Sequence, residues 1–310
     1  MKKKLILVTG ATGAQGGSVA RALLADDHFS VRIITRNISS PKALELKAAG
    51  ADVVQGDLDD TASLLRAMRG CYGVFGITNY WEHFEKEYQQ GKNLTDAIKL
   101  AEIEHFVFHT LPDYSQLSGG KYPTPHCDIK AELQKYCKSL DIPATFLHTA
   151  FYYENFFSFF PPQKAADGSL FFGFPQGDTK LAMASVEDTG GIVRSIFHHP
   201  TAYIGRTVGV VGADDTCAEY AKLMSKVLNQ NIQYRYIPRA VYADLGFPGA
   251  EELANMFEVQ RLYIQNRQID LIESYGLNTE MQSFEKWLSK NKDLFEAQFA
   301  ALHPMEEMVA

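Results

Sequence analysis

The chain has 310 residues, of which 46% are hydrophobic, and it carries a formal net charge of −7 with an isoelectric point near 5.7. This size allows a large buried core and fits one large α/β domain with a smaller appended region. The acidic balance argues against direct binding of nucleic acid. No stretch approaches ~18 apolar residues, and the lysine-rich start leads straight into a short strand, so neither a membrane span nor a secretory leader is expected.

The four cysteines favour a reducing compartment, which predicts a protein of the cytoplasm or also of the nucleus. Cys71, Cys127, Cys137 and Cys217 form no CxxC pair and show no metal-ligand spacing, so we expect free thiols and no metal site. His198 lies at the end of a predicted helix, where partial positive charge is favourable, and is not expected to hold zinc.

The first predicted strand, residues 5–8, runs directly into three glycines that are each separated by two residues. Gly10 allows the tight turn after the strand, Gly13 lets a pyrophosphate approach the backbone, and Gly16 lets the next helix pack against the sheet. That helix is predicted over residues 14–25, and its first N–H groups favour negative charge. Glycine-rich turns are common, but this one begins a βαβ pattern and therefore predicts a dinucleotide site.

The second strand of this unit, residues 31–35, decides which dinucleotide the site prefers. It ends at Arg36 and Asn37, about 20 residues after the last glycine, where a site for NAD usually carries an acidic residue. A guanidinium suits a 2′-phosphate, so Arg36 favours NADP(H), and a merely solvated arginine is the alternative. The hydroxyl of Ser40 is a further possible donor, but strong cations are few here, which predicts a moderate preference.

Strands and helices then alternate, as a doubly wound parallel sheet requires. Further strands are predicted over residues 52–55, 72–77, 105–110 and 144–148, and further helices over residues 41–49, 60–69, 84–101 and 127–140. The strands are short and almost continuously apolar, which is typical of buried parallel strands. Residues 1–150 are therefore predicted to form a Rossmann-type α/β domain, with a sheet that later strands complete.

Ligands of such sheets collect at the carboxyl ends of the strands. This rule selects four segments, namely Gly56-Asp57-Leu58, Thr78-Asn79-Tyr80-Trp81, His109-Thr110 and residues 149–157. The carboxylate of Asp57 could accept a hydrogen bond from the adenine amino group, and an ordinary turn or helix-cap aspartate is the alternative. The aromatic residues of 149–157 predict either core or the wall of a partly apolar pocket.

Beyond residue 150 the alternation ends, and residues 151–310 are predicted to form a smaller C-terminal α+β region over the cofactor cleft. Residues 169–174 and 180–185 are predicted to pair as an antiparallel hairpin around a Pro-Gln-Gly-Asp turn. Helices are expected over 186–198 and 217–228, strands over 207–211 and 232–237, and helical segments from there to a frayed tail after Pro304.

Several motifs together resemble those of the NmrA-like family, an atypical branch of the short-chain dehydrogenase/reductase superfamily. The glycine loop alone would indicate only the superfamily, whereas Thr78-Asn-Tyr-Trp-Glu82 and Gly246-Phe-Pro-Gly-Ala250 are much more specific. The similarity extends from Leu5 to about Phe295 and is closest to members that sense NADP(H). Further matching motifs are Thr35-Arg-Asn37, Gly56-Asp57, Tyr153-Glu-Asn155 and Leu253-Ala-Asn-Met-Phe257.

The resemblance implies a Rossmann domain that binds NADP(H). Sensing members of the family carry more basic residues directly after the Arg-Asn pair, where this chain has Ile38-Ser39-Ser40, so the strength of 2′-phosphate binding stays open. The residues implied for cofactor binding are Gly10, Thr12, Gly13, Ala14, Gln15, Gly16, Arg36, Asn37, Ser40, Asp57, Leu58, Thr78, Asn79, Tyr80, Lys130, Tyr153, Glu154 and Asn155.

Dehydrogenases of this superfamily use a Tyr-x-x-x-Lys pair on one helix face, because the ammonium lowers the pKa of the phenol. Here Lys130 follows His126 at that spacing, and His109-Thr110 stands where a serine is expected after the fifth strand. The resemblance implies that Lys130 holds the nicotinamide ribose. His126 is the candidate acid, since an imidazole suits proton transfer near neutral pH, and a structural or exposed histidine is the alternative.

Three hypotheses follow, in this order. The first is an NADP(H)-binding redox sensor that lacks the usual Tyr-x-x-x-Lys site and whose output is association with a protein partner or a homodimer governed by cofactor. The second is an NADPH-dependent reductase of a small carbonyl, quinone or imine. The third is a scaffold in which the cofactor contributes only stability.

Overall fold

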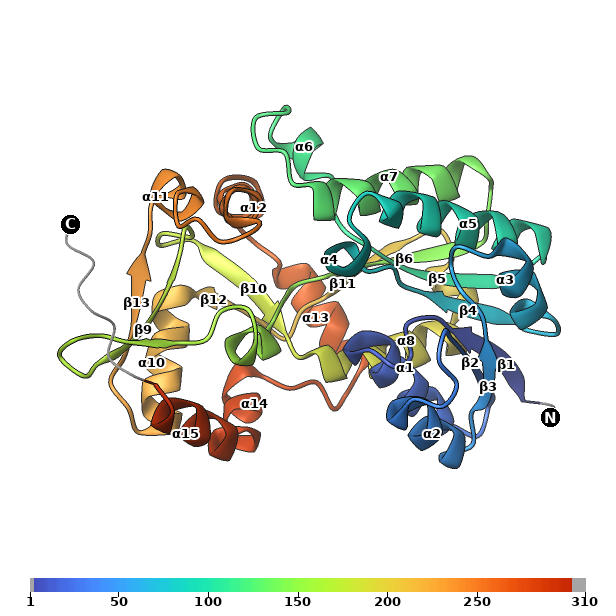
Figure 1. Cartoon of the computed structure of the whole chain (residues 1–310), viewed down its shortest axis with the longest axis horizontal. Coiled ribbons are helices and arrows are strands. Elements are labelled where there is room, and N and C mark those ends of the chain that lie inside the picture. Colours follow the sequence, from blue (N-terminus) through green and yellow to red (C-terminus); the bar gives the residue numbers. More distant parts are fainter. Residues whose placement is uncertain (1–2, 303–310) are drawn as a thin grey trace.

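The computed structural model describes residues 3–302 and shows a large sheet joined to a smaller C-terminal part (Figure 1). The sheet has seven strands in the order β11-β6-β5-β4-β1-β2-β3, and its pairs are all parallel. The predicted Rossmann-type fold class is confirmed, and the tail after Pro304 lies outside the described residues. The strands are β1 Lys4–Val8, β2 Phe29–Thr35, β3 Asp52–Gln55, β4 Gly73–Gly76, β5 His105–Thr110, β6 Ala144–Thr149 and β11 Thr207–Val210.

Helices cover both faces of this sheet, as the apolar strands require (Figure 1). One layer holds α3 Thr61–Met68, α5 Lys86–Leu100 and α7 Pro125–Ser139, and the other holds α1 Ala14–Leu24, α2 Pro41–Ala48 and α8 Thr189–His198. Because side chains alternate along a strand, Leu7 belongs to the buried cluster under the first layer, together with Leu133, whereas Ile6 and Val8 belong to the cluster under the second, together with Phe197. Burial on both faces explains the continuous apolar runs.

The helix predicted over residues 84–101 begins later and has a separate first turn. In the structure α4, Tyr80–His83, follows β4 closely, and α5 starts at Lys86. Phe84 between them has a φ of +45°, a left-handed conformation that costs energy for a residue with a Cβ. This break turns α4 away from the axis of α5 and directs residues 80–83 toward the C-terminal part.

The C-terminal part contains two small sheets, ordered β12-β10-β7 and β13-β9-β8, around an aromatic core. Phe156, Phe174, Phe257, Phe284 and Trp287 are each at most 2% exposed in this core. Its elements are β7 Phe151–Tyr152, η1 Tyr153–Phe157, β8 Gln163–Lys164, β9 Leu170–Phe174, β10 Lys180–Ala184, β12 Ala213–Thr216, α10 Cys217–Leu228, β13 Ile232–Tyr236, α11 Arg239–Ala243, α12 Ala250–Tyr263, α14 Phe284–Lys290 and α15 Lys292–Ala300. Two elements connect it with the first part, since η2 Val186–Asp188 packs against α1 and α13 Gln268–Leu277 packs against β11 and α8. Two more short helices, α6 Tyr114–Leu117 and α9 Pro200–Tyr203, belong to the first part.

The predicted antiparallel hairpin of residues 169–174 with 180–185 is wrong. Both segments are strands, but β9 pairs in parallel with β13 and antiparallel with β8, whereas β10 pairs with β12 and β7. Four consecutive residues of β10 are buried, which is typical of a central strand. Because β12 and β7 occupy both edges of β10, no edge remains for β9.

Within residues 3–302, no helix has the length and apolarity to cross a bilayer.

Candidate functional site

The turn after β1 has the geometry that its three glycines predict. Gly10 has a φ of +61°, and its carbonyl accepts a hydrogen bond from the Gly13 N–H at 2.9 Å. A Cβ on Gly16 would lie 2.4 Å from the carbonyl oxygen of Gly10, so α1 can approach the turn only through glycine. Gly13 caps α1 without any side-chain hydrogen bond, which leaves the first N–H groups of the helix available to an anion.

The Arg36 guanidinium, at the end of β2, already has a carboxylate partner. Its Nη2 donates to Oε1 of Glu82 on α4 at 2.5 Å, and both side chains are about half exposed. The hydrogen bond that Arg36 donates to Glu82 is the main cause that raises the pKa of Arg36, and the same bond lowers the pKa of Glu82. Sequence reasoning placed Arg36 here but did not connect it with Glu82, because the two residues are 46 positions apart.

The residues next to Arg36 and those after β3 make local turns. The Ser40 hydroxyl accepts a hydrogen bond from the Ala43 N–H and caps α2, and the Asn37 side chain accepts one from the Ser39 N–H. Asp57 Oδ1 accepts from the N–H of Asp59. These contacts are those of ordinary turns and helix caps, the alternative that the sequence left open for Asp57. The cofactor contacts predicted for the same residues stay predictions.

Lys130, on α7, lies in a buried ion pair with Glu87 of α5, next to the segment that follows β4. Its Nζ contacts Oε1 of Glu87 and donates to the backbone oxygen and Oγ1 of Thr78, both at 3.2 Å. The Thr78 hydroxyl in turn donates to Glu87 at 2.6 Å. Glu87 is fully buried, and its Oε2 has no hydrogen-bond partner in the described structure. The carboxylate therefore compensates the Lys130 charge and fixes the ammonium beside Thr78.

His126 is held by a carboxylate from the C-terminal part. Oε1 of Glu252, on α12, lies 2.6 Å from His126 Nδ1 and accepts the His126 backbone N–H at 2.7 Å. The phenol of Tyr80 donates to Glu252 Oε2 at 3.4 Å. Since Nδ1 is held by Glu252, any proton exchange with a substrate falls to Nε2. Glu252 was missed from the sequence, although it directly precedes Leu253-Ala-Asn-Met-Phe257, one of the motifs that carry the family resemblance.

Burial and charge shift the pKa values of this group in opposite directions. Burial raises the pKa of Glu252, but the hydrogen bonds from the His126 side chain and backbone outweigh it and hold this pKa below its ordinary value. Burial and the nearby Glu252 charge raise the pKa of Tyr80 to about 12. Tyr80 therefore stays a neutral hydrogen-bond donor at physiological pH, which suits its bond to the carboxylate.

Two buried polar atoms beside this cluster and the glycine loop lack partners. Gln15 Oε1, in the first turn of α1, and His109 Nδ1, at the end of β5, have no hydrogen bond within residues 3–302. Burial, with the Lys130 charge, lowers the pKa of His109 well below its ordinary value, so its ring is neutral. Together with the open helix start at Gly13, these atoms fit a bound polar group at the carboxyl edge of the sheet.

Tyr153 and Glu154, which the resemblance implies as cofactor ligands, have internal partners in the structure. Tyr153 is fully buried and donates to the Gln282 carbonyl at 3.4 Å. Glu154 accepts hydrogen bonds from Ser185 Oγ, the Val186 N–H and Trp287 Nε1 between 2.7 and 3.0 Å. These contacts join η1 to η2, to α14 and to the segment before α14. The cofactor contacts implied for Tyr153, Glu154 and Asn155 stay predictions.

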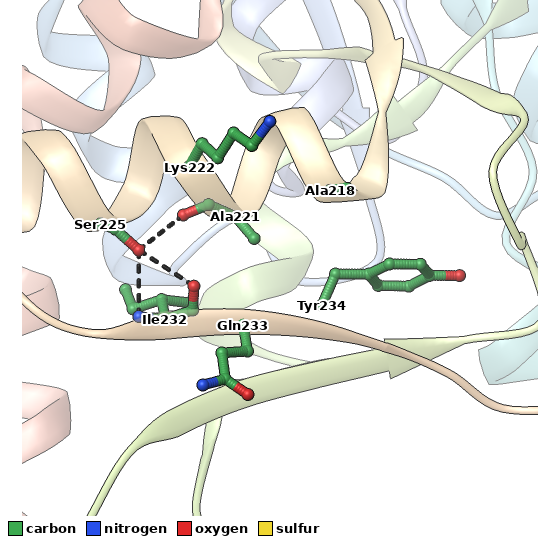
Figure 2. Close-up of a pocket in the computed structure, with 7 residues that line it drawn as sticks. All are labelled: Ala218, Ala221, Lys222, Ser225, Ile232, Gln233 and Tyr234. Atoms are coloured by element: carbon green, nitrogen blue, oxygen red, sulfur yellow. Dashed lines mark hydrogen bonds between the residues drawn. The ribbon is translucent and has the colours of Figure 1, made fainter.

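Two surface hollows lie in the C-terminal part, and none of the predicted site residues lines either of them. Figure 2 shows the first, of about 430 Å³, between α10 and β13, where Ser225 bonds to the backbone of Ile232. The second, of about 590 Å³, lies among β12, α13 and the start of α14. Both hollows are far along the chain from the glycine loop and hold neither Lys130 nor His126.

One cluster has the composition of a metal site, at the opposite edge of the sheet. Asp26, after α1, accepts from His28 Nδ1 at 2.9 Å and from His198 Nε2 at 2.7 Å, and the ligand atoms lie within 4.8 Å of one another. Burial opposes the shift, but the two histidines lower the pKa of Asp26 to about 2. Hydrogen bonding to two imidazoles accounts for this arrangement, and sequence reasoning had read His198 only as a helix end.

The parallel seven-stranded sheet, with a glycine turn leading from β1 into α1, defines a Rossmann-type α/β protein. The model of the NmrA-like family matches residues 2–288, and the chain belongs to this family. An NmrA-like family domain-containing protein of Dictyostelium discoideum is 33% identical over 251 residues, which cover 78% of this chain and 83% of that protein. The NmrA-like family domain-containing oxidoreductase FrzB of Cladobotryum is 33% identical over 248 residues, 72% of this chain and 74% of that protein.

Solved structures share the fold at lower identity. A crystal structure of NmrA, described as a negative transcriptional regulator, in complex with NADP has a TM-score of 0.83 at 23% identity and covers 97% of this chain and 98% of that chain. The NADPH-dependent quinone oxidoreductase QOR2 of Escherichia coli, complexed with NADPH, has a TM-score of 0.76 at 22% identity, with 92% and 99% covered. At these identities the likeness shows the fold alone.

Proposed function

We propose that this protein binds NADP(H) at the carboxyl edge of the sheet and acts as a redox sensor, with protein association as its output. The observation that carries the proposal is the changed proton-donor position. His126 stands four residues before Lys130, and each side chain is held by a fully or largely buried carboxylate rather than by the other side chain. A tyrosine activated by the lysine, as the usual dehydrogenase requires, is therefore replaced by two separate contacts with carboxylates.

The chain's own residues supply a binding role for each part of the cofactor. The N–H groups at the start of α1 would bind the pyrophosphate, and Arg36 would bind the 2′-phosphate. Lys130 and Thr78 would orient the nicotinamide ribose, because Glu87 fixes the ammonium at the end of β4. When bound, the nicotinamide supplies a hydride donor or acceptor. The structures of NmrA with NADP and of QOR2 with NADPH support this choice of cofactor.

The sensor is tested by comparing the assembly of three forms of the protein. Because a ligand shifts an equilibrium only by its different affinity for the two states, light-scattering profiles must differ among the free, NADP-bound and NADPH-bound forms. The partner is a protein or a second copy of this chain, in the cytoplasm or the nucleus. Identical profiles in the three forms, together with turnover of any substrate, overturn the sensor.

A second candidate is an NADPH-dependent reductase of a small carbonyl, quinone or imine. The observation that favours it is the Glu252–His126 contact, since a carboxylate on Nδ1 orients an imidazole for proton transfer at Nε2. Relatives named as oxidoreductases point the same way. A panel of carbonyls, quinones and imines with NADPH tests this function, and His126→Ala should then lower kcat by roughly 10²–10⁴ while cofactor affinity stays nearly intact.

A further inference from the structure

The Glu82 carboxylate occupies the partner position that a 2′-phosphate would need on Arg36. Their ion pair of 2.5 Å is exposed enough for a ligand to displace it, with side-chain exposures of 57% for Arg36 and 46% for Glu82. Asn79 Nδ2 donates to the other oxygen of Glu82 at 3.3 Å, which holds the carboxylate toward the guanidinium. Arg36 is thus both the strongest candidate for 2′-phosphate binding and already neutralised.

We propose that Glu82 is the specificity-determining residue that sets the preference between NADP(H) and NAD(H), by competing with the 2′-phosphate for Arg36. The proposal rests on the cofactor site proposed above. NAD(H) brings no phosphate to this position, so the Arg36–Glu82 pair stays intact when it binds. NADP(H) must break that pair and place its phosphate near a released carboxylate, which opposes binding by like-charge repulsion. Glu82 therefore makes the preference for NADP(H) over NAD(H) smaller than it would be with Arg36 alone.

The short helix that carries Glu82 also contacts the C-terminal part. In Figure 1, α4 lies between the large sheet and the C-terminal elements. The Trp81 ring lies 5.3 Å from the His126 ring, and a Cβ on Gly249 would lie 3.2 Å from Trp81. Tyr80 donates to Glu252 on α12. Release of Glu82 by a 2′-phosphate is therefore expected to change the surroundings of Trp81, whereas NAD leaves them as they are.

The proposal is tested by titration calorimetry of wild type and Glu82→Gln with NADP and NAD. The matched fragments 2′,5′-ADP and 5′-AMP isolate the 2′-phosphate from the nicotinamide. Glutamine keeps the size of the side chain and removes its charge, so Kd for NADP and 2′,5′-ADP should fall roughly three- to tenfold, and Kd for NAD and AMP should change less than about twofold. In an Arg36→Ala background, Glu82→Gln should hardly change the affinity for NADP, because Glu82 and the 2′-phosphate then have no guanidinium for which to compete.

Glu85→Gln is the matched control, since Glu85 is exposed on the same segment and forms no ion pair within residues 3–302. A second measurement follows tryptophan emission, which NADP should change more than NAD, with the difference lost in Trp81→Phe. Three results would overturn the role of Glu82. They are unchanged or weaker NADP binding in Glu82→Gln, an equal increase in its affinity for NAD, and the same increase in NADP affinity in Glu85→Gln. A wild-type protein that binds neither nucleotide overturns the proposed cofactor site itself.

Discussion

The carboxylate of Glu252 is predicted to be a principal link between the C-terminal part and the large sheet. It accepts two hydrogen bonds from His126 and one from Tyr80, and its side chain is only 15% exposed. Hydrogen bonds to a charged group contribute ~1.5–3 kcal/mol each, but partial exposure and relaxation reduce their sum. Glu252→Ala should therefore lower the free energy of unfolding by about 2–3 kcal/mol, measured by urea unfolding at pH 7.

The neighbouring Glu251 provides a matched control for this substitution. Its side chain is 74% exposed and pairs with Arg239 at 3.1 Å, so Glu251→Ala should lower the free energy of unfolding by at most ~1 kcal/mol. Both substitutions change the same helix from glutamate to alanine, and their difference removes the effect of helix propensity. Equal losses in the two variants would refute the role assigned to Glu252.

The pH dependence follows from the lowered pKa of Glu252. A carboxyl whose pKa is lower in the folded state than its ordinary value of 4.5 stabilises the fold fully above pH 4.5. This contribution is lost as the pH falls through the folded pKa. The stability difference between wild type and Glu252→Ala should thus be constant from pH 7 to about 5 and shrink below pH 4.5. A difference that grows on acidification contradicts the assignment.

Three further predictions concern the cofactor site. Arg36→Ala should weaken NADP binding by ~1.5–3 kcal/mol and leave NAD nearly unchanged, and equal losses in calorimetry would refute the 2′-phosphate contact. Gly13→Val should abolish binding of NADP and NADPH, because a side chain at this position blocks the approach of the pyrophosphate to the backbone, while cooperative thermal unfolding persists. Lys130→Met should cost about 3–5 kcal/mol of stability by leaving Glu87 buried without its counter-charge, and Glu87→Gln in the same chain should recover much of it; urea unfolding that shows no recovery contradicts the ion pair.

The first half of the fold was predictable because its signals are local. The central strands β4 and β5 are buried on both faces and are largely apolar in sequence. Each crossover helix follows its strand within a few residues. Gly10 and Gly16 need their residue type for reasons that lie within one turn, a positive φ and a close backbone approach. The placement of Arg36 after β2 follows from the same short-range order.

The pairing of strands in the C-terminal part was not predictable from such signals. The segments of β9 and β10 are both largely apolar and flank a turn, a pattern that fits a hairpin as well as two strands of different sheets. The choice depends on which partner buries the larger apolar surface. In the structure β9 pairs with β13, some 60 positions later in the chain, and β10 pairs with β12. The residues of the turn, 175–179, carry no signal for these distant partners.

The amino-acid sequence by itself determined the Rossmann sheet, the glycine turn and the absence of tyrosine before Lys130, because each depends on spacing within one element or one crossover. Only the tertiary structure decided which carboxylates face the site. Glu82 reaches Arg36, Glu87 reaches Lys130, and Glu252 reaches His126 across 46, 43 and 126 positions. The sequence does not distinguish a helical glutamate that is exposed to solvent from one that forms an ion pair, because the partner depends on how the helices pack.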